Sequence, residues 1–171
     1  MGRTSKKKKR ASSGPKDTLS AELQNRLYEW AEKGHQQALA GNHQDAIDIW
    51  KQAVQWIPEP KHRYTSTADF YGAIAFQYQM MGLFPQALDW MKKSMDCWGA
   101  EASHNPFTLL HLGELYYELG EMEYSVDCLR RAYVLEGDEL FEPDVYGKID
   151  HRKYLEIVKH VLHGEGEESI P

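Results

Sequence analysis

The sequence predicts an all-α fold of about seven helices, stacked as antiparallel hairpins. Small residues recur at fixed spacing inside amphipathic segments, in three copies. Each copy begins with a small residue and reaches a glycine seven residues later: Gly34 and Gly41, Ala75 and Gly82, Gly113 and Gly120. Small side chains let two helices approach closely, and glycine permits the left-handed turn that ends the first helix. The repeated unit is therefore a helix–turn–helix hairpin.

The first hairpin is predicted over residues 19–41 and 43–57. Leu19, Leu23 and Leu27 follow one another at four-residue spacing, which places them on one face of a helix. Pro58 and Pro60 lack the amide that a helix needs and end the second helix.

The remaining helices follow from the same periodicity. The second hairpin is predicted over residues 64–81 and 85–98. Asn105 and Pro106 are typical of an N-cap followed by proline in the first turn, so a fifth helix runs from there to residue 119. A sixth is predicted over residues 122–136. A seventh, over residues 145–163, covers the exposed end of the stack.

The domain boundaries come from composition. A chain of 171 residues is long enough for one domain with a sizeable core. Residues 1–17 are polar and basic and are predicted to form a disordered tail. Residues 18–163 form the helical repeat domain, and residues 164–171 are predicted to form a disordered acidic tail.

The net charge of −6 hides a strong asymmetry. Residues 1–16 contain seven basic residues and no acidic residue. The rest of the chain contains 13 basic and 26 acidic residues, a formal charge of −13. Such a body repels nucleic acid and attracts basic surfaces.

Several functional classes find no support. The chain has no nucleophile elbow, phosphate-binding loop or dinucleotide fingerprint, so no catalytic residue and no cofactor is assigned. Glu156, His160 and His163 share one helical face, but a face on a terminal helix more often meets solvent, and no metal site is predicted. No apolar stretch approaches the ~18 residues of a membrane span.

Cys97 and Cys128 both fall in second helices of hairpins. They are interpreted as small core residues in a reducing compartment, which predicts a cytoplasmic protein. The basic run Lys6–Arg10 has three possible interpretations. It is a nuclear-import signal in a eukaryotic cell, part of an arm over Arg3–Arg10 that contacts nucleic acid, or a solvated tail.

The repeated pattern resembles the tetratricopeptide repeat (TPR), whose signature is W-x2-L-G-x2-Y followed by A-x3-F, A and P. The first copy carries the matching residues Trp30, Gly34, Gly41, Ala46, Trp50, Ala53 and Pro58. The second carries Tyr71, Ile74, Ala75, Tyr78, Gly82, Ala87, Met91 and Ser94, and the third Leu109, Leu112, Gly113, Tyr116, Gly120, Ser125, Leu129 and Ala132. The copies are 41 and 38 residues apart, not the usual ~34. The resemblance implies a right-handed superhelical α-solenoid.

The resemblance also implies that the first helices of the hairpins line a concave groove. Carried over position by position, it assigns nine groove residues: Tyr28, His35, Asp69, Phe76, Gln79, Phe107, Glu114, Tyr117 and Glu118. A subset of the family clamps a partner's terminal carboxylate with Lys, Asn and Arg. This chain has Ala31, Gly72 and Leu110 at one clamp position and His35, Phe76 and Glu114 at another, so that function is not transferred.

An aromatic and acidic groove predicts a non-enzymatic protein-interaction module with a basic protein partner. Asp69, Glu114 and Glu118 are expected to select positive charge, while Phe76 and Tyr117 supply contact area. The alternative is a small acidic inhibitor that neutralises a basic toxin or nuclease, as bacterial immunity proteins do. The sequence leaves the oligomeric state open.

Overall fold

The computed structural model describes residues 17–143 and 149–164, and within these ranges it contains seven α-helices and no strand. The α-helices are α1 Ala21–Leu39, α2 His43–Gln55, α3 Thr65–Met80, α4 Phe84–Trp98, α5 Pro106–Glu118, α6 Met122–Glu136 and α7 Arg152–Gly164. Three short 3-10 helices join them: η1 Lys61–Arg63, η2 Gly99–His104 and η3 Asp138–Phe141. The all-α, TPR-like solenoid is confirmed.

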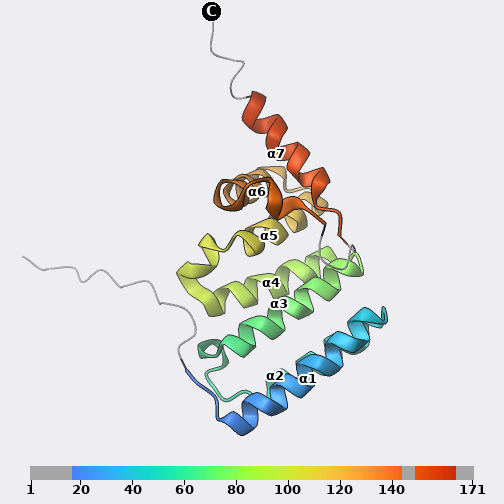
Figure 1. The fold of residues 1–171 in the computed structure, drawn as a ribbon, viewed down its shortest axis with the longest axis vertical. Helices are drawn as coiled ribbons and strands as arrows, with labels where there is room; N and C mark the ends of the chain where they lie inside the picture. The colour runs from blue at the N-terminus through green and yellow to red at the C-terminus, as the bar shows by residue number, and fades with distance from the viewer. Residues whose placement is uncertain (1–16, 144–148, 165–171) are drawn as a thin grey trace, which may run out of the picture.

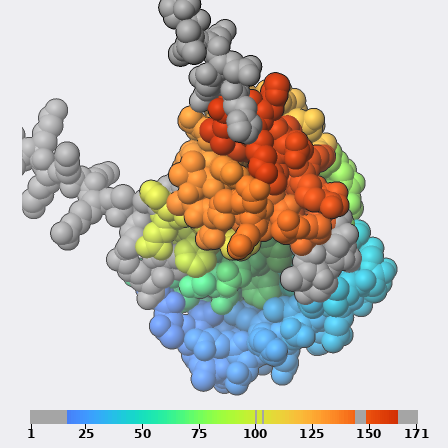
Figure 2. Space-filling view, turned by 45° about the horizontal axis from the view of Figure 1, so that its top comes forward, coloured from blue at the N-terminus to red at the C-terminus, as the bar shows by residue number. Residues whose placement is uncertain are grey.

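The α-helices pair as hairpins that stack one upon another (Figure 1). The α1–α2 hairpin lies at one end, the α3–α4 and α5–α6 hairpins follow, and α7 lies against the far end. In the space-filling view, the green surface of α3 lies between the blue first hairpin and the orange and red C-terminal elements (Figure 2). Residues of the first helices, α1, α3 and α5, line one hollow of the stack.

Close approach inside each hairpin depends on the predicted small residues. A Cβ atom added to Gly34 would lie 2.1 Å from the Trp50 ring, and one added to Gly113 would lie 2.5 Å from Leu129. The hydroxyl of Ser125 donates a hydrogen bond to the Gly113 carbonyl over 2.7 Å. The large side chain on the second helix therefore fills the space that the missing Cβ leaves on the first.

The core of the described residues consists of two hydrophobic clusters, which meet at a boundary that we call the seam. One joins the first hairpin to α3, and the other joins the second and third hairpins to α7. Tyr78 and Trp90 pack against both clusters. The ammonium of Lys51, on α2, donates to the Tyr78 hydroxyl over 2.9 Å and lies 5.3 Å from the centre of the Trp90 ring. These contacts link the first hairpin to the second.

The predicted helix boundaries hold closely for α1 to α6. The Asn105 side chain accepts a hydrogen bond from the Thr108 amide over 3.0 Å, which confirms the predicted N-cap of α5. The turns after the first helices contain Gly41, Gly82 and Gly120 with φ of +83°, +71° and +77°, the left-handed conformation that glycine adopts without strain.

The predicted start of the last helix is wrong. Helix α7 begins at Arg152, and Ile149 and Asp150 are not helical; residues 145–148 lie outside the described ranges. The Asp150 carboxylate accepts from the Arg152 amide over 3.1 Å and also binds the Arg152 guanidinium. A side chain that caps the helix at this point competes with continuation of the helix toward the N-terminus.

The predicted tails lie mostly outside the described residues, which begin at Asp17 and end at Gly164. The prediction that Asp17 belongs to the disordered tail is wrong. Its amide donates to the Arg63 carbonyl over 3.0 Å, and its carboxylate pairs with the Arg63 guanidinium at 2.9 Å. The chain is therefore anchored before α1 to the connection between α2 and α3.

We expect Gly113→Ala to lower the free energy of unfolding by about 1–3 kcal/mol, because the new methyl group would overlap Leu129 at its side chain and lie 3.2 Å from its backbone nitrogen. Gly72→Ala is the matched control within a helix. Its methyl group would find its nearest neighbour at 3.6 Å, so the variant should gain about 0.5–1 kcal/mol from helix propensity. Urea denaturation of both variants measures the difference, and equal midpoints would contradict the close approach of α5 and α6.

Candidate functional site

The inner surface of the stack contains two adjoining hollows of about 530 and 510 Å³. His35, Trp50, Asp69 and Ala73 line both, so the hollows are two parts of one groove. The hollow of 510 Å³ runs along α1 and α3, and the hollow of 530 Å³ continues along α3 to the start of α5. We call the two hollows together the groove.

The groove wall is aromatic and acidic. Among the described residues that line it there is no lysine and no arginine, and the two carboxylates are Glu32 and Asp69. Tyr28 and Phe107 are exposed groove aromatics, with 68% and 63% of their surface accessible. Phe76 lies between them on α3. Such a wall offers contact area to an apolar group and attraction to a cation.

Asp69 is the central polar group of the groove. It lies on α3 where the two hollows meet, and the described residues provide it with no hydrogen bond or ion pair. Partial burial raises the pKa of its carboxyl above the ordinary value of 3.8. A partly desolvated carboxylate without a partner is stabilised when a cation binds beside it.

Three histidines belong to the same wall: His35, His43 and His111. The Nδ1–H of His43 donates to the Gln77 side chain over 2.7 Å, which fixes the ring against α3. The ring of His111 lies edge-on to Phe76, with 5.8 Å between centroids. His111 therefore connects the groove to the polar cluster at its far end.

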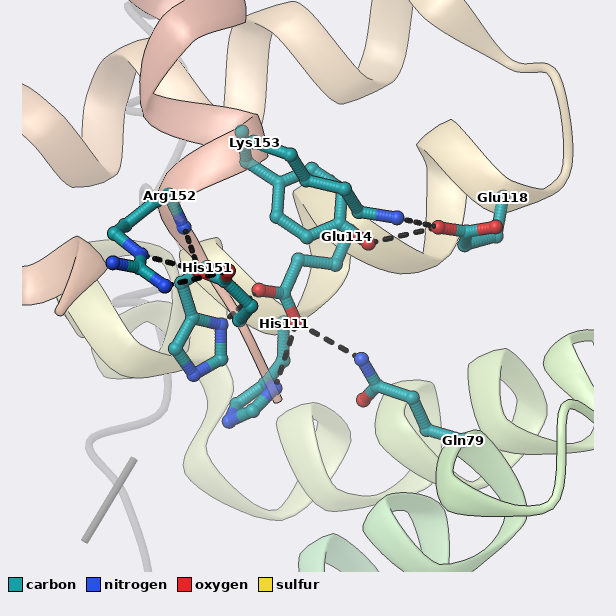
Figure 3. Close-up of polar contacts among 9 residues, drawn as sticks. Gln79, His111, Glu114, Glu118, His151, Arg152 and Lys153 are labelled. Carbon is teal, nitrogen blue, oxygen red and sulfur yellow. Dashed lines mark hydrogen bonds and ion pairs between the residues drawn. The ribbon is translucent and has the colours of Figure 1, made fainter. Parts of the chain in front are cut away.

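That cluster surrounds Glu114, which has no exposed surface. Its carboxylate accepts a hydrogen bond from the Nδ1–H of His151 and another, over 2.9 Å, from the side-chain amide of Gln79 (Figure 3). The Nδ1 atom of His111 lies 3.4 Å from Oε2 of the same carboxylate. Burial alone would raise the pKa of Glu114, but the hydrogen bond from His151 and the nearby His111 ring overcome it and lower the pKa from 4.5 to about 2. Glu114 is therefore ionised at neutral pH, and its hydrogen bonds come from within the chain.

A second set of contacts joins the next turn of α5 to the first turn of α7. The Glu118 carboxylate binds the Lys153 ammonium at 2.5 Å and accepts from the Tyr154 hydroxyl over 2.9 Å. The rings of Tyr117 and Tyr154 pack edge to face with 5.6 Å between centroids. Together with Glu114 and His151, these contacts anchor α7 to α5.

The nine predicted groove residues therefore divide into two groups. Five line the groove: Tyr28, His35, Asp69, Phe76 and Phe107. Four belong to the contacts that surround Glu114 or anchor α7: Gln79, Glu114, Tyr117 and Glu118. The expectation that Glu114 presents its charge to a partner is wrong, because the chain itself covers and pairs this carboxylate.

The repeat pattern does not identify His151 and Lys153 as partners of α5. The predicted helix over residues 145–163 contains both residues away from its ends, and its periodicity does not indicate that either side chain contacts α5. The usable signal was Asp150, an N-cap residue type that would have placed the helix start beside His151.

Other chemistries find little support in the described residues. No group of three His, Cys, Asp or Glu side chains there is placed to hold a metal ion. Cys97 and Cys128 are buried free thiols, and burial raises the pKa of Cys128 to about 11, which opposes formation of a thiolate. Within the same part of the chain, no helix has the length and apolarity to cross a membrane.

Comparison with known proteins shows the fold. No family model and no curated protein sequence matches the chain. Among solved structures, the chain is similar to the crystal structure of MamA, with a TM-score of 0.53 and 14% sequence identity over 84% of this chain and 82% of that one. At this level of identity the likeness concerns the arrangement of helices.

We expect the buried Glu114 to make the fold sensitive to acid. Because its pKa is lowered in the folded state, its contribution is complete above its ordinary pKa of 4.5 and is lost as the pH falls toward 2. The loss should be on the order of 3 kcal/mol. Denaturant unfolding at pH 2 to 7 measures it.

Two variants isolate this effect. Glu114→Gln should flatten the fall in stability between pH 5 and pH 2 and lower stability at neutral pH, because the histidines lose their charged partner. Glu123→Gln, at an exposed position of α6, should keep the acid dependence of the unaltered protein. If the free energy of unfolding fell equally with pH in Glu114→Gln and in the unaltered protein, Glu114 would not be the source of the acid sensitivity.

Proposed function

We propose that the protein is a non-enzymatic interaction module whose groove binds a lysine- or arginine-bearing segment of another protein. The observation that carries this proposal is Asp69, an exposed carboxylate of the groove wall whose pKa is raised by desolvation and which has no partner among the described residues. The described residues that line the groove include no lysine and no arginine. A bound cation would restore the electrostatic stabilisation that the carboxylate loses by leaving bulk water.

The aromatic wall supports the same proposal. Tyr28, Phe76 and Phe107 are distributed along the groove on α1, α3 and α5, on both sides of Asp69 in the stack. Aromatic side chains supply large contact areas at small entropic cost, and they attract the aliphatic stems and charged ends of lysine and arginine. A surface held by stacked helices is already ordered before a partner arrives, which reduces the cost of binding.

The buried cluster at the far end supports a stabilising role for α7. Glu114 and Glu118 are already paired with His151 and Lys153, so the carboxylates left for a partner are Asp69 and Glu32. The proposed binding surface is consequently the α1–α3 part of the stack and the start of α5, rather than the whole length of α5.

The experiment begins with capture of the partner from the cell of origin, its identification and its purification. Calorimetric titration then compares variants. Asp69→Lys should weaken binding at least tenfold, because it places a positive charge where a cation should bind. Phe76→Ala should weaken it about thirtyfold, the ~2 kcal/mol of an aromatic hot spot, mainly through faster dissociation.

Asp89→Lys provides the matched control, since Asp89 is an exposed carboxylate of α4 outside the groove. It makes the same charge change and should alter the affinity less than twofold. Normal binding by both groove variants would refute the groove as the binding surface. The identity of the partner separates a scaffold from the inhibitor alternative, in which the partner is a basic toxin or nuclease.

A further inference from the structure

The N-terminus of the described chain lies at one end of the groove. Asp17 is hydrogen-bonded and ion-paired to Arg63, which immediately precedes the start of α3. Ser66, in the first turn of α3, and Gln24, in the first turn of α1, both line the groove. The described chain therefore begins beside the groove entrance, and residues 1–16, which we call the basic arm, directly precede this point in the sequence.

The segment between Lys6–Arg10 and Asp17 is long enough for the basic side chains to reach the groove. Ser66 and Asp69 are three residues apart on α3, about 4.5 Å along the helix axis. The lysines and arginine of Lys6–Arg10 precede Asp17 by seven to eleven residues, a reach of up to about 23–36 Å for an extended chain. Short flexible tethers hold a segment near its site at millimolar effective concentration.

The charges of the two surfaces are complementary. The basic arm has seven positive charges and no acidic residue. The described residues of the groove wall include Asp69 and Glu32 but no lysine or arginine. The arm also matches the chemistry of the partner proposed above.

We propose that the basic arm occupies the groove of its own chain and pairs with Asp69 and Glu32. The inference rests on the proposed function in one respect: the arm then competes with the protein partner, which must displace it. Charge-changing modification of the arm, such as lysine acetylation, would weaken this internal contact and open the groove.

Zero-length cross-linking of the full-length protein tests the contact directly. A carbodiimide joins a lysine ammonium to a carboxylate only when the two are in contact. Peptide mapping of the monomer fraction should identify links from Lys6, Lys7, Lys8 or Lys9 to Asp69 or Glu32. Asp69 and Glu32 should each receive at least fivefold more of these links than Asp89, an exposed carboxylate of α4 outside the groove.

A second measurement tests the competition and needs no natural partner. The probe is a synthetic peptide with the sequence of residues 1–16. A full-length variant with Lys6–Arg10 replaced by glutamine should bind this peptide at least threefold more tightly than the unaltered protein, whose own arm occupies the groove. When Asp69→Asn is added to this glutamine variant, the peptide should bind more weakly.

Three results would overturn the proposal. The first is cross-links found only in dimers, which would place the arm on a second copy of the chain. The second is links spread evenly over acidic residues outside the groove, with equal peptide affinities. The third is salt-sensitive binding of nucleic acid by the arm together with no link to Asp69. None of these results bears on whether a protein partner binds the groove, so the two proposals fail separately.

Discussion

Close approach of two helices within each hairpin is the constraint on which the structure depends. Gly34 and Gly113 leave no room for a Cβ atom, because Trp50 and Leu129 occupy that space from the opposite helix. With the pairs held at this distance, the hairpins can stack through the sides of α3 and α5. The seam at Tyr78 and Trp90 then joins two clusters into one core.

The stacking also determines where binding surface exists. The first helices line the inner side, so every hairpin contributes residues to a shared wall, and the helix backbones of this wall are held by the packed core behind them. The wall is limited at one end, because residues 151–154 pack against α5 and pair with Glu114 and Glu118. The last helix thus stabilises the stack and shortens the surface that a partner can reach.

Asp69 and Glu114 are both carboxylates on first helices of hairpins, but their surroundings shift their pKa values in opposite directions. Glu114 is enclosed and has a lowered pKa, because two histidines and an amide from three separate segments converge on it. Asp69 faces the groove and has a raised pKa, because its surroundings remove water without supplying a cation. The first contributes to stability, and the second is available for recognition. The proposed contacts with the basic arm and with a protein partner both depend on this difference.

The sequence by itself determined the hairpins, because each depends on contacts that repeat locally: the glycine turns, the small residues and the N-cap at Asn105. The repeat also predicted the helix faces that carry Tyr28, Asp69 and Phe76, and these residues line the two hollows; their part in binding stays a prediction. The burial of Glu114 was decided only by the tertiary structure. Its partner His151 lies 37 residues away in a segment outside the repeat, and no local periodicity specifies which side chain will cover the end of a stack.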